Sequence, residues 1–139
     1  MKDKPNIYVY EEETFIVGED TFIESTSENN FTVIFEDNLE TGYFYAVDRE
    51  NGMEMLDALH VYNVADVVDK QKPSILKIFW TEDSTKSLLV INDYCHAVFD
   101  FKNKAGYCRN AFPKSKSDWT KIENRNLTEE LLNELLNQV

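Results

Sequence analysis

The sequence predicts a mainly β (α+β) fold: an antiparallel β-meander that forms a sheet, a half-open barrel or a sandwich, with one C-terminal amphipathic helix. Three observations support this prediction. Short segments rich in aromatic and β-branched residues recur along the chain between polar clusters, as they do in antiparallel sheets. Helical periodicity is clear only after residue 126. No linker rich in Pro, Gly or Ser divides the chain, so we expect a single domain over residues 1–139.

Each expected strand is a run of aromatic or β-branched residues that ends at a polar cluster or a glycine. In chain order these runs cover residues 6–11, 14–18, 21–25, 31–36, 43–48, 59–64, 75–81, 87–93, 96–101 and 106–110. The stretch GMEMLDA, residues 52–58, is expected to form a short helix or an irregular turn.

The hairpin expected from residues 31–48 carries apolar side chains on both faces. If Glu36 and Tyr43 close its loop, Ile34 lies opposite Tyr45 on one face and Phe35 lies on the other. Either the hairpin is covered on both sides by the protein itself, or one face is an exposed patch. That patch would consist of Ile34, Tyr43 and Tyr45, with Glu36, Asp37 and Glu40 at its rim. The exposed arrangement would be typical of a binding surface.

The hairpin expected near NDYCHAVFDFKNKAGYCRNAFPKSK holds both cysteines. A turn at KNKA places Phe99 opposite Cys108, and alternation puts Cys95 on the same face as Phe99. Cys95 is then about 13 Å from Cys108 along the strands, which is too far for a disulfide. A metal site is not expected, because His60 lies in another expected strand and no CxxC spacing occurs.

The opposite face of this hairpin gathers polar side chains, namely His96, Asp100, Tyr107 and Arg109. They are either the ordinary polar side of an amphipathic hairpin or the acid, base and anion-binding groups of a ligand face. His96 and Asp100 are four residues apart on one strand, so a direct hydrogen bond between them is not expected.

The C-terminal segment shows one apolar stripe with helical spacing. Thr128 is a suitable N-cap, and the two glutamates that follow it suit the positive end of the helix dipole. Because so short a helix is marginal alone, the stripe must pack on the sheet or on a partner. Its members are Leu127, Leu131, Leu132, Leu135, Leu136 and Val139.

The net charge of -12 is concentrated in the first part of the chain. Residues 1–57 contain fifteen acidic and three basic residues, whereas residues 58–139 contain eleven of each. Such a segment repels nucleic acid and attracts basic protein surfaces, although the acidic residues could also serve only to keep the domain in solution.

Several classes of function are not expected. The sequence has no phosphate-cradling glycine loop, no G-x-S-x-G elbow and no H-E-x-x-H motif, so neither an enzyme nor a cofactor-binding protein is predicted. No secretory signal and no apolar run long enough to cross a membrane is found, so a cytoplasmic protein with reduced thiols is expected.

Residues 88–113, LLVINDYCHAVFDFKNKAGYCRNAFP, resemble a motif of an uncharacterised bacterial domain family. The size and acidity of the chain are also similar to those of the small immunity proteins of contact-dependent inhibition and other polymorphic toxin systems. This second resemblance implies a stoichiometric inhibitor that covers a basic toxin domain, such as a nuclease.

The sequence-based hypothesis is therefore a partner-binding protein with an acidic surface. The residues expected to contact the partner are Glu11, Glu12, Glu13, Glu19, Asp20, Glu36, Asp37, Glu40, Tyr43 and Tyr45. The alternative is a ligand-binding or regulatory domain that uses the face of His96, Asp100, Tyr107 and Arg109.

Overall fold

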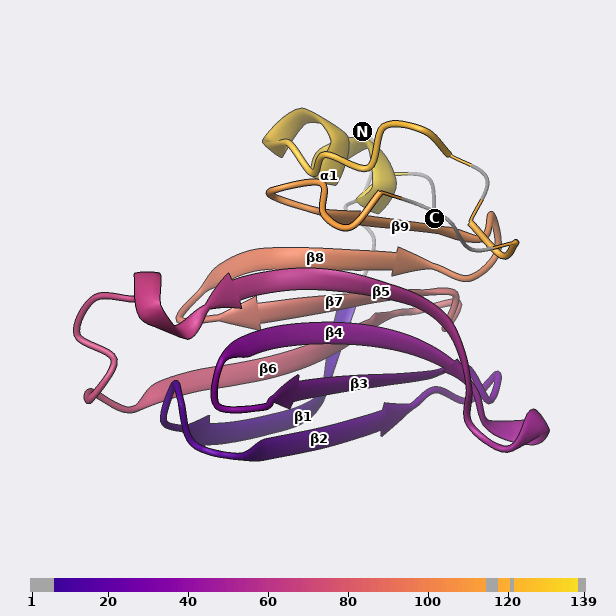
Figure 1. Cartoon of the computed structure of the whole chain (residues 1–139). Helices are drawn as coiled ribbons and strands as arrows, with labels where there is room; N and C mark the ends of the chain where they lie inside the picture. Colours follow the sequence, from indigo (N-terminus) through magenta and orange to yellow (C-terminus); the bar gives the residue numbers. More distant parts are fainter. Residues whose placement is uncertain (1–6, 115–117, 121, 138–139) are drawn as a thin grey trace.

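Two antiparallel β-sheets stack face to face (Figure 1). The structure is a computed structural model that describes residues 7–114, 118–120 and 122–137. Sheet A has the strand order β1-β6-β7-β8-β9, and sheet B has the order β2-β3-β4-β5. A helix, α1, lies near the C-terminal end of the chain. This arrangement confirms the predicted fold class in its sandwich form.

The elements follow the chain with short connections. The strands of sheet A are β1 (Ile7–Phe15), β6 (Ser74–Thr81), β7 (Lys86–Ile91), β8 (Tyr94–Asp100) and β9 (Ala105–Cys108). The strands of sheet B are β2 (Thr21–Thr26), β3 (Thr32–Asp37), β4 (Thr41–Asp48) and β5 (Glu54–Asn63). The helices are η1 (Arg49–Asn51) and η2 (Val64–Asp66), which are single 3₁₀ turns, and α1 (Glu129–Leu136).

Two segments differ from the prediction. Separate strands are expected over residues 6–11 and 14–18, whereas the structure has one strand, β1, over Ile7–Phe15, with a bulge between Val9 and Glu11. The acidic triplet does not interrupt β1, because β1 is an edge strand and its side chains reach solvent. Residues 54–58, expected to form a helix or turn, are the first half of β5. These residues have no clear helical or strand periodicity, and their pairing with β4 makes them a strand.

The main core lies between the two sheets. Phe35 and Phe44 from sheet B and Trp80 and Phe99 from sheet A are all fully buried there. The Trp80 indole N–H donates to Ser25 Oγ at 2.9 Å, so a buried hydrogen bond also joins the sheets. The register predicted for the hairpin of residues 31–48 is confirmed, since Phe35 pairs with Phe44.

A second core lies on the other face of sheet A, beneath α1. Leu88 and Val98 of the sheet pack there against Leu127 and Leu135, so the predicted apolar stripe packs on the sheet, except for Val139, which lies outside the described residues. None of the helices among the described residues has the length and apolar character needed to cross a membrane.

The N-terminus of α1 is capped by Thr128, as predicted, because its side chain accepts a hydrogen bond from the Leu131 N–H at 3.0 Å. We expect Thr128→Ala to lower the free energy of unfolding by about 1 kcal/mol, since that N–H loses its partner. Thr128→Ser, which keeps the hydroxyl, is the matched control. Urea denaturation followed by circular dichroism measures both, and equal losses in the two variants would contradict the capping role.

The segment after β9 closes one side of the sandwich, next to the edge strand β5. The Cys108 N–H donates to Arg125 O at 3.0 Å and the Leu127 N–H donates to Cys108 O at 2.9 Å, so residues 125–127 run beside β9. On the other flank, the His60 N–H of β5 donates to Phe112 O at 2.8 Å. These contacts place residues 109–114 against β5.

Candidate functional site

The α-helix in the described part of the chain does not cover the outer face of sheet B. It packs on sheet A, on the far side of the sandwich. Large apolar side chains are therefore exposed around sheet B: Phe22 is 61% exposed, Met55 56% and Phe112 53%. The patch expected from Ile34, Tyr43 and Tyr45 is only partly exposed: Ile34 is buried, at 6% exposure, whereas Tyr43 and Tyr45 are half-buried.

Four rings form a continuous row across this face, here called the aromatic row. Tyr45 and Tyr43 stack with ring centroids 5.8 Å apart, and Tyr43 meets His60 edge-on at 5.3 Å. His60 in turn meets Phe112 edge-on at 5.8 Å. The row belongs to β4, β5 and the loop after β9, so three separate segments build it.

The His60 ring is held in place from both sides. Its Nε2 lies 3.0 Å from Asn63 Oδ1, and its Nδ1 contacts the Asn110 side chain. His60 is 9% exposed, so it supports Tyr43 and Phe112 from below. A row with a fixed central ring is preorganised for binding, because less conformational entropy is lost when a partner covers it.

A carboxylate borders the aromatic row on β3. The Tyr45 hydroxyl donates to Glu36 at 3.3 Å. Burial and the neighbouring charge of Glu36 raise the pKa of Tyr45 to about 12, so the phenol stays protonated at neutral pH and keeps this hydrogen bond. On β2, Glu24 pairs across from Ile34 and forms an exposed ion pair with Arg49 at 3.7 Å.

The acidic residues predicted to contact a partner are divided among three places. Glu11, Glu12 and Glu13 lie on β1, the edge strand of sheet A. The turns that carry Glu19, Asp20 and Glu40 meet at one end of the sandwich, where the Gly18 N–H donates to an Asp37 carboxylate oxygen at 2.8 Å. Among the predicted acids, Glu36 alone lies beside the two tyrosines.

The structure corrects the expectation for Asp37, which is fully buried and cannot contact a partner. Its carboxylate accepts hydrogen bonds from the Gly18 N–H and the Leu39 N–H, both at 2.8 Å, and from the Tyr62 hydroxyl at 2.6 Å. Burial and the Asp37 carboxylate raise the pKa of Tyr62 above its usual range. Asp37 therefore fastens three segments at the end of sheet B.

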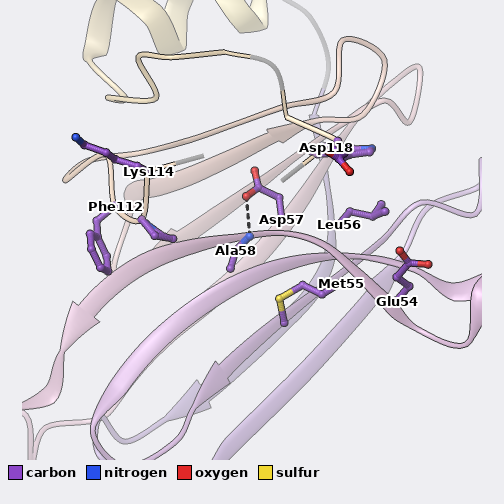
Figure 2. A pocket seen from close by; sticks show the side chains of 10 residues that line it. Glu54, Met55, Leu56, Asp57, Ala58, Phe112, Lys114 and Asp118 are labelled. Atoms are coloured by element: carbon purple, nitrogen blue, oxygen red, sulfur yellow. Dashed lines mark hydrogen bonds between the residues drawn. The ribbon is translucent and has the colours of Figure 1, made fainter. Parts of the chain in front are cut away.

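A pocket of about 750 Å³ opens beside β5, next to the end of the aromatic row (Figure 2). One wall is the edge strand β5 over residues 54–58, and the other is formed by residues 112–114 and 118–119. Most of its lining is apolar, with three charged side chains at its borders. The lining residues are Glu54, Met55, Leu56, Asp57, Ala58, Phe112, Pro113, Lys114, Asp118 and Trp119.

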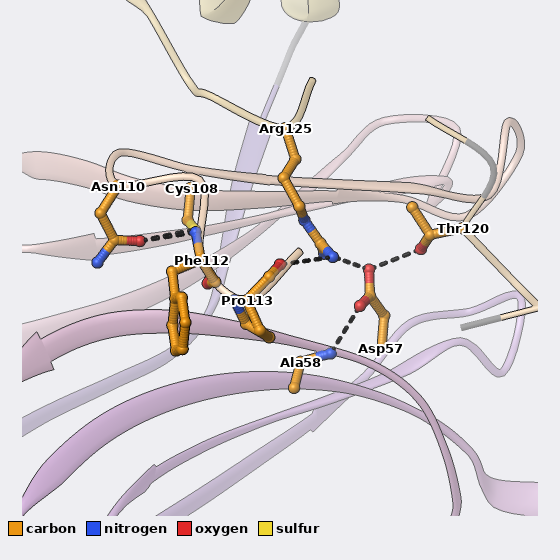
Figure 3. A network of polar contacts seen from close by, with 8 residues as sticks. All are labelled: Asp57, Ala58, Cys108, Asn110, Phe112, Pro113, Thr120 and Arg125. Atoms are coloured by element: carbon orange, nitrogen blue, oxygen red, sulfur yellow. Dashed lines mark hydrogen bonds and ion pairs between the residues drawn. The ribbon is translucent and has the colours of Figure 1, made fainter. Parts of the chain in front are cut away.

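A buried polar network fixes the floor of this pocket (Figure 3). Asp57 accepts hydrogen bonds from the Arg125 guanidinium, from the Thr120 hydroxyl at 2.6 Å and from the Ala58 N–H at 2.9 Å. Arg125, 1% exposed, also donates to Pro113 O at 3.2 Å. Arg125 therefore ties both walls of the pocket together from beneath.

The four side chains of the alternative ligand face serve as structural contacts. Asp100 is buried and accepts hydrogen bonds from the backbone and side chain of Asn103, at 3.1 and 2.8 Å, in the turn before β9. Tyr107 packs in the second core beneath α1. Arg109 donates to Cys95 O at 2.9 Å and Leu127 O at 3.2 Å. It also pairs with a glutamate at the start of α1.

His96 is held in its neutral form. Burial and the nearby Arg109 guanidinium lower the pKa of His96 to about 4. The unfolded chain takes up a proton near pH 6.5 while the folded protein does not. Stability should therefore fall as the pH drops from about 6.5 towards 4, by roughly 1–2 kcal/mol near pH 5.

We expect His96→Gln to flatten this part of the stability curve, because glutamine does not titrate. Chemical denaturation at a series of pH values measures the slope, and NMR titration of the His96 ring measures its pKa directly. A ring pKa near 6.5 would contradict the assignment.

The register of the β8-β9 hairpin differs from the prediction by two residues. Phe99 pairs with Gly106, and Cys108 pairs with Ala97, because the four-residue turn begins one residue earlier than expected, between Asp100 and Ala105. Cys108 lies in the main core as predicted. A bulge at His96 turns Cys95 to the other face, where it packs in the second core. Both cysteines are free thiols, and burial raises the pKa of Cys95 to about 12.

Sequence reasoning missed the residues that build the pocket. Asp57 lies in a segment expected to form a short helix or an irregular turn, and Arg125 lies between the last expected strand and the C-terminal apolar stripe. Their pairing spans 68 residues of chain, so no local spacing could reveal it. The sequence did contain one indication of the role of this loop. Phe112 is a large apolar residue in a polar stretch, just before a proline, which suggests a packing or binding role for it.

Comparison with known proteins places the chain among bacterial proteins. The family described as "Uncharacterized protein conserved in bacteria (DUF2251)" matches residues 15–136. This match confirms the resemblance noted for residues 88–113. An uncharacterized protein of Haemophilus influenzae (strain Rd) is 46% identical over 102 residues, which cover 71% of this chain. The chain spans 63% of the length of that relative. No solved structure matches.

Proposed function

The chain belongs to the DUF2251 family of bacterial proteins, and we propose that it binds and neutralises a basic protein partner, as an immunity protein does with a toxin domain. The observation that carries this proposal is the aromatic row on the uncovered face of sheet B, with a carboxylate hydrogen-bonded at its end. Aromatic anchors beside charged groups are the composition that protein interfaces use.

The geometry of the row supports a protein rather than a small-molecule partner. The row extends over two strands and a loop, and hollows border Phe112 on both sides: the pocket beside β5 and a second hollow of about 490 Å³ next to His60. An interface needs a broad surface with a few recesses that receive side chains of the partner. Tyr43, Tyr45 and Phe112 are the side chains we assign as anchors.

The distribution of charge supports a basic partner. Glu36 contacts the row directly, while the acidic residues on β1 and in the turns at the end of the sandwich lie away from it. Distant carboxylates act through the long-range field, so we assign them to steering the partner rather than to contact. A nuclease domain is a suitable partner, because its substrate groove is positively charged in order to hold phosphates.

The partner to test is encoded next to this chain, since a toxin and its inhibitor must be inherited together. A large secreted protein with a variable C-terminal domain in the adjacent open reading frame supplies the candidate. Expression of that C-terminal domain alone should stop growth of the host cell, and co-expression of this chain should restore it. A metabolic operon around the gene, or growth arrest that this chain does not relieve, would refute the proposal.

A further inference from the structure

The pocket beside β5 is preorganised, because contacts within the protein hold both of its walls in place. The Arg125 guanidinium joins Asp57 of one wall to Pro113 O of the other. Trp119 is fixed from behind, since its ring packs edge-on against Phe101 with centroids 5.5 Å apart. The volume of about 750 Å³ lies within the range of small-molecule pockets, which is roughly 300–1,000 Å³.

The lining of the pocket selects for an apolar body. Met55, Leu56, Phe112, Pro113 and Trp119 supply aliphatic and aromatic surface. The one acidic group on the floor is already compensated, because Asp57 accepts hydrogen bonds from a guanidinium, a hydroxyl and a backbone N–H. The floor therefore has no free charge with which to bind a polar head group.

The charged groups at the border of the pocket select for a cation at one end. Figure 2 shows Glu54 and Asp118 at one end of the pocket and Lys114 at the other, beside Phe112. Two carboxylates at the same end attract a positive group there, and neither of them is paired with Lys114 among the ion pairs of the described residues.

We propose that this pocket binds a small organic amine: a ring-sized apolar body that packs on Met55 and Trp119, with its ammonium group between Glu54 and Asp118. This ligand site shares Phe112 with the proposed partner surface, but Tyr43, Tyr45 and Glu36 do not line it. The domain would then carry two binding functions, one on the face of sheet B and one beside its edge.

The test compares three probes of one shape and different charge: 2-phenylethylamine, 2-phenylethanol and 3-phenylpropionate. Binding to the whole chain is followed by NMR through the Trp119 indole and the Met55 methyl signals. The amine should bind roughly 5-fold more tightly than the alcohol, and the carboxylate should bind most weakly, because one exposed charge contributes about 0.2–1 kcal/mol. Equal affinities, a preference for the carboxylate, or no shift with any probe would overturn the proposal.

Variants separate this site from the rest of the surface. Glu54→Gln and Asp118→Asn should each weaken the amine roughly 2- to 5-fold and leave the alcohol unchanged. Glu134→Gln, on an exposed position of α1, is the charge-matched control and should change neither. Tyr45→Ala should leave amine binding unchanged. The proposed partner binding and the proposed amine binding can therefore be refuted independently of each other. If Glu134→Gln weakened amine binding as much as Glu54→Gln, the preference for the amine would come from the net charge of the protein and not from this site. That result would overturn the proposal.

Discussion

Replacing Asp57 by alanine is expected to lower the free energy of unfolding by about 3–5 kcal/mol, because it leaves the buried Arg125 guanidinium without its counter-charge. Arg125 is 1% exposed, and its Nε already has no partner, so loss of Asp57 removes its remaining charged contact. The Thr120 hydroxyl would lose its acceptor as well. Urea or thermal denaturation measures the loss, which approaches the whole stability of a marginal domain.

A double-mutant cycle shows whether the pair acts as a unit. Asp57→Leu with Arg125→Met removes both charges and should cost less than either single change, because no uncompensated buried charge is left. The exposed pair of Glu24 and Arg49, 3.7 Å apart, is a matched control whose removal should cost less than about 1 kcal/mol. If the loss in free energy of unfolding of the double variant equalled the sum of the two single losses, Asp57 and Arg125 would not act as a coupled pair.

In a complex with the basic protein partner proposed above, Tyr45→Ala is expected to weaken binding by about 2–3 kcal/mol, roughly 30- to 150-fold. The substitution removes the end of the aromatic row and the partner of the Glu36 carboxylate. Titration calorimetry of the purified pair measures the change. Because Tyr45 is only partly buried, the free energy of unfolding should fall less than for a core substitution.

Two further tyrosine variants locate the effect. Tyr45→Phe keeps the stacked ring and loses only the hydrogen bond to Glu36, so it should retain most of the affinity. Tyr8→Ala removes a more exposed tyrosine, 49% exposed, from β1 of the other sheet, and it should not affect binding. Equal losses for Tyr8→Ala and Tyr45→Ala would show that the partner does not select the face of sheet B.

The fold could be predicted from the sequence wherever local pattern and tertiary structure agree. The register of β3 with β4 followed from the alternation of Phe35 and Ile34, and the N-cap of α1 followed from Thr128 and the apolar stripe behind it. The prediction failed where long-range pairing decides. β5 begins in a segment with no clear periodicity, and β4 alone makes it a strand. The bulge at His96 reversed the face of Cys95, and no composition rule marks such a bulge.

The candidate site was predictable only in part. Tyr43, Tyr45 and Glu36 are near neighbours in one hairpin, so the sequence could bring them together. His60 and Phe112 join the row from segments far along the chain, and only the closure of the sandwich places them there. The acidic residues predicted to contact a partner are divided among β1, the turns at one end of the sandwich and the edge of the aromatic row. An acidic residue within an acidic stretch of sequence need not be exposed. Asp37 is fully buried, and its carboxylate accepts three hydrogen bonds.

The central claim is that an acidic domain with an aromatic face binds a basic protein partner, and the salt dependence of the association rate tests it most directly. Stopped-flow mixing of this chain with the proposed basic partner should show an association rate constant that falls about 10-fold or more between about 50 mM and about 500 mM salt, because salt screens the steering charges. Tyr45→Ala should instead increase the dissociation rate. An association rate that does not change across this salt range would contradict the account.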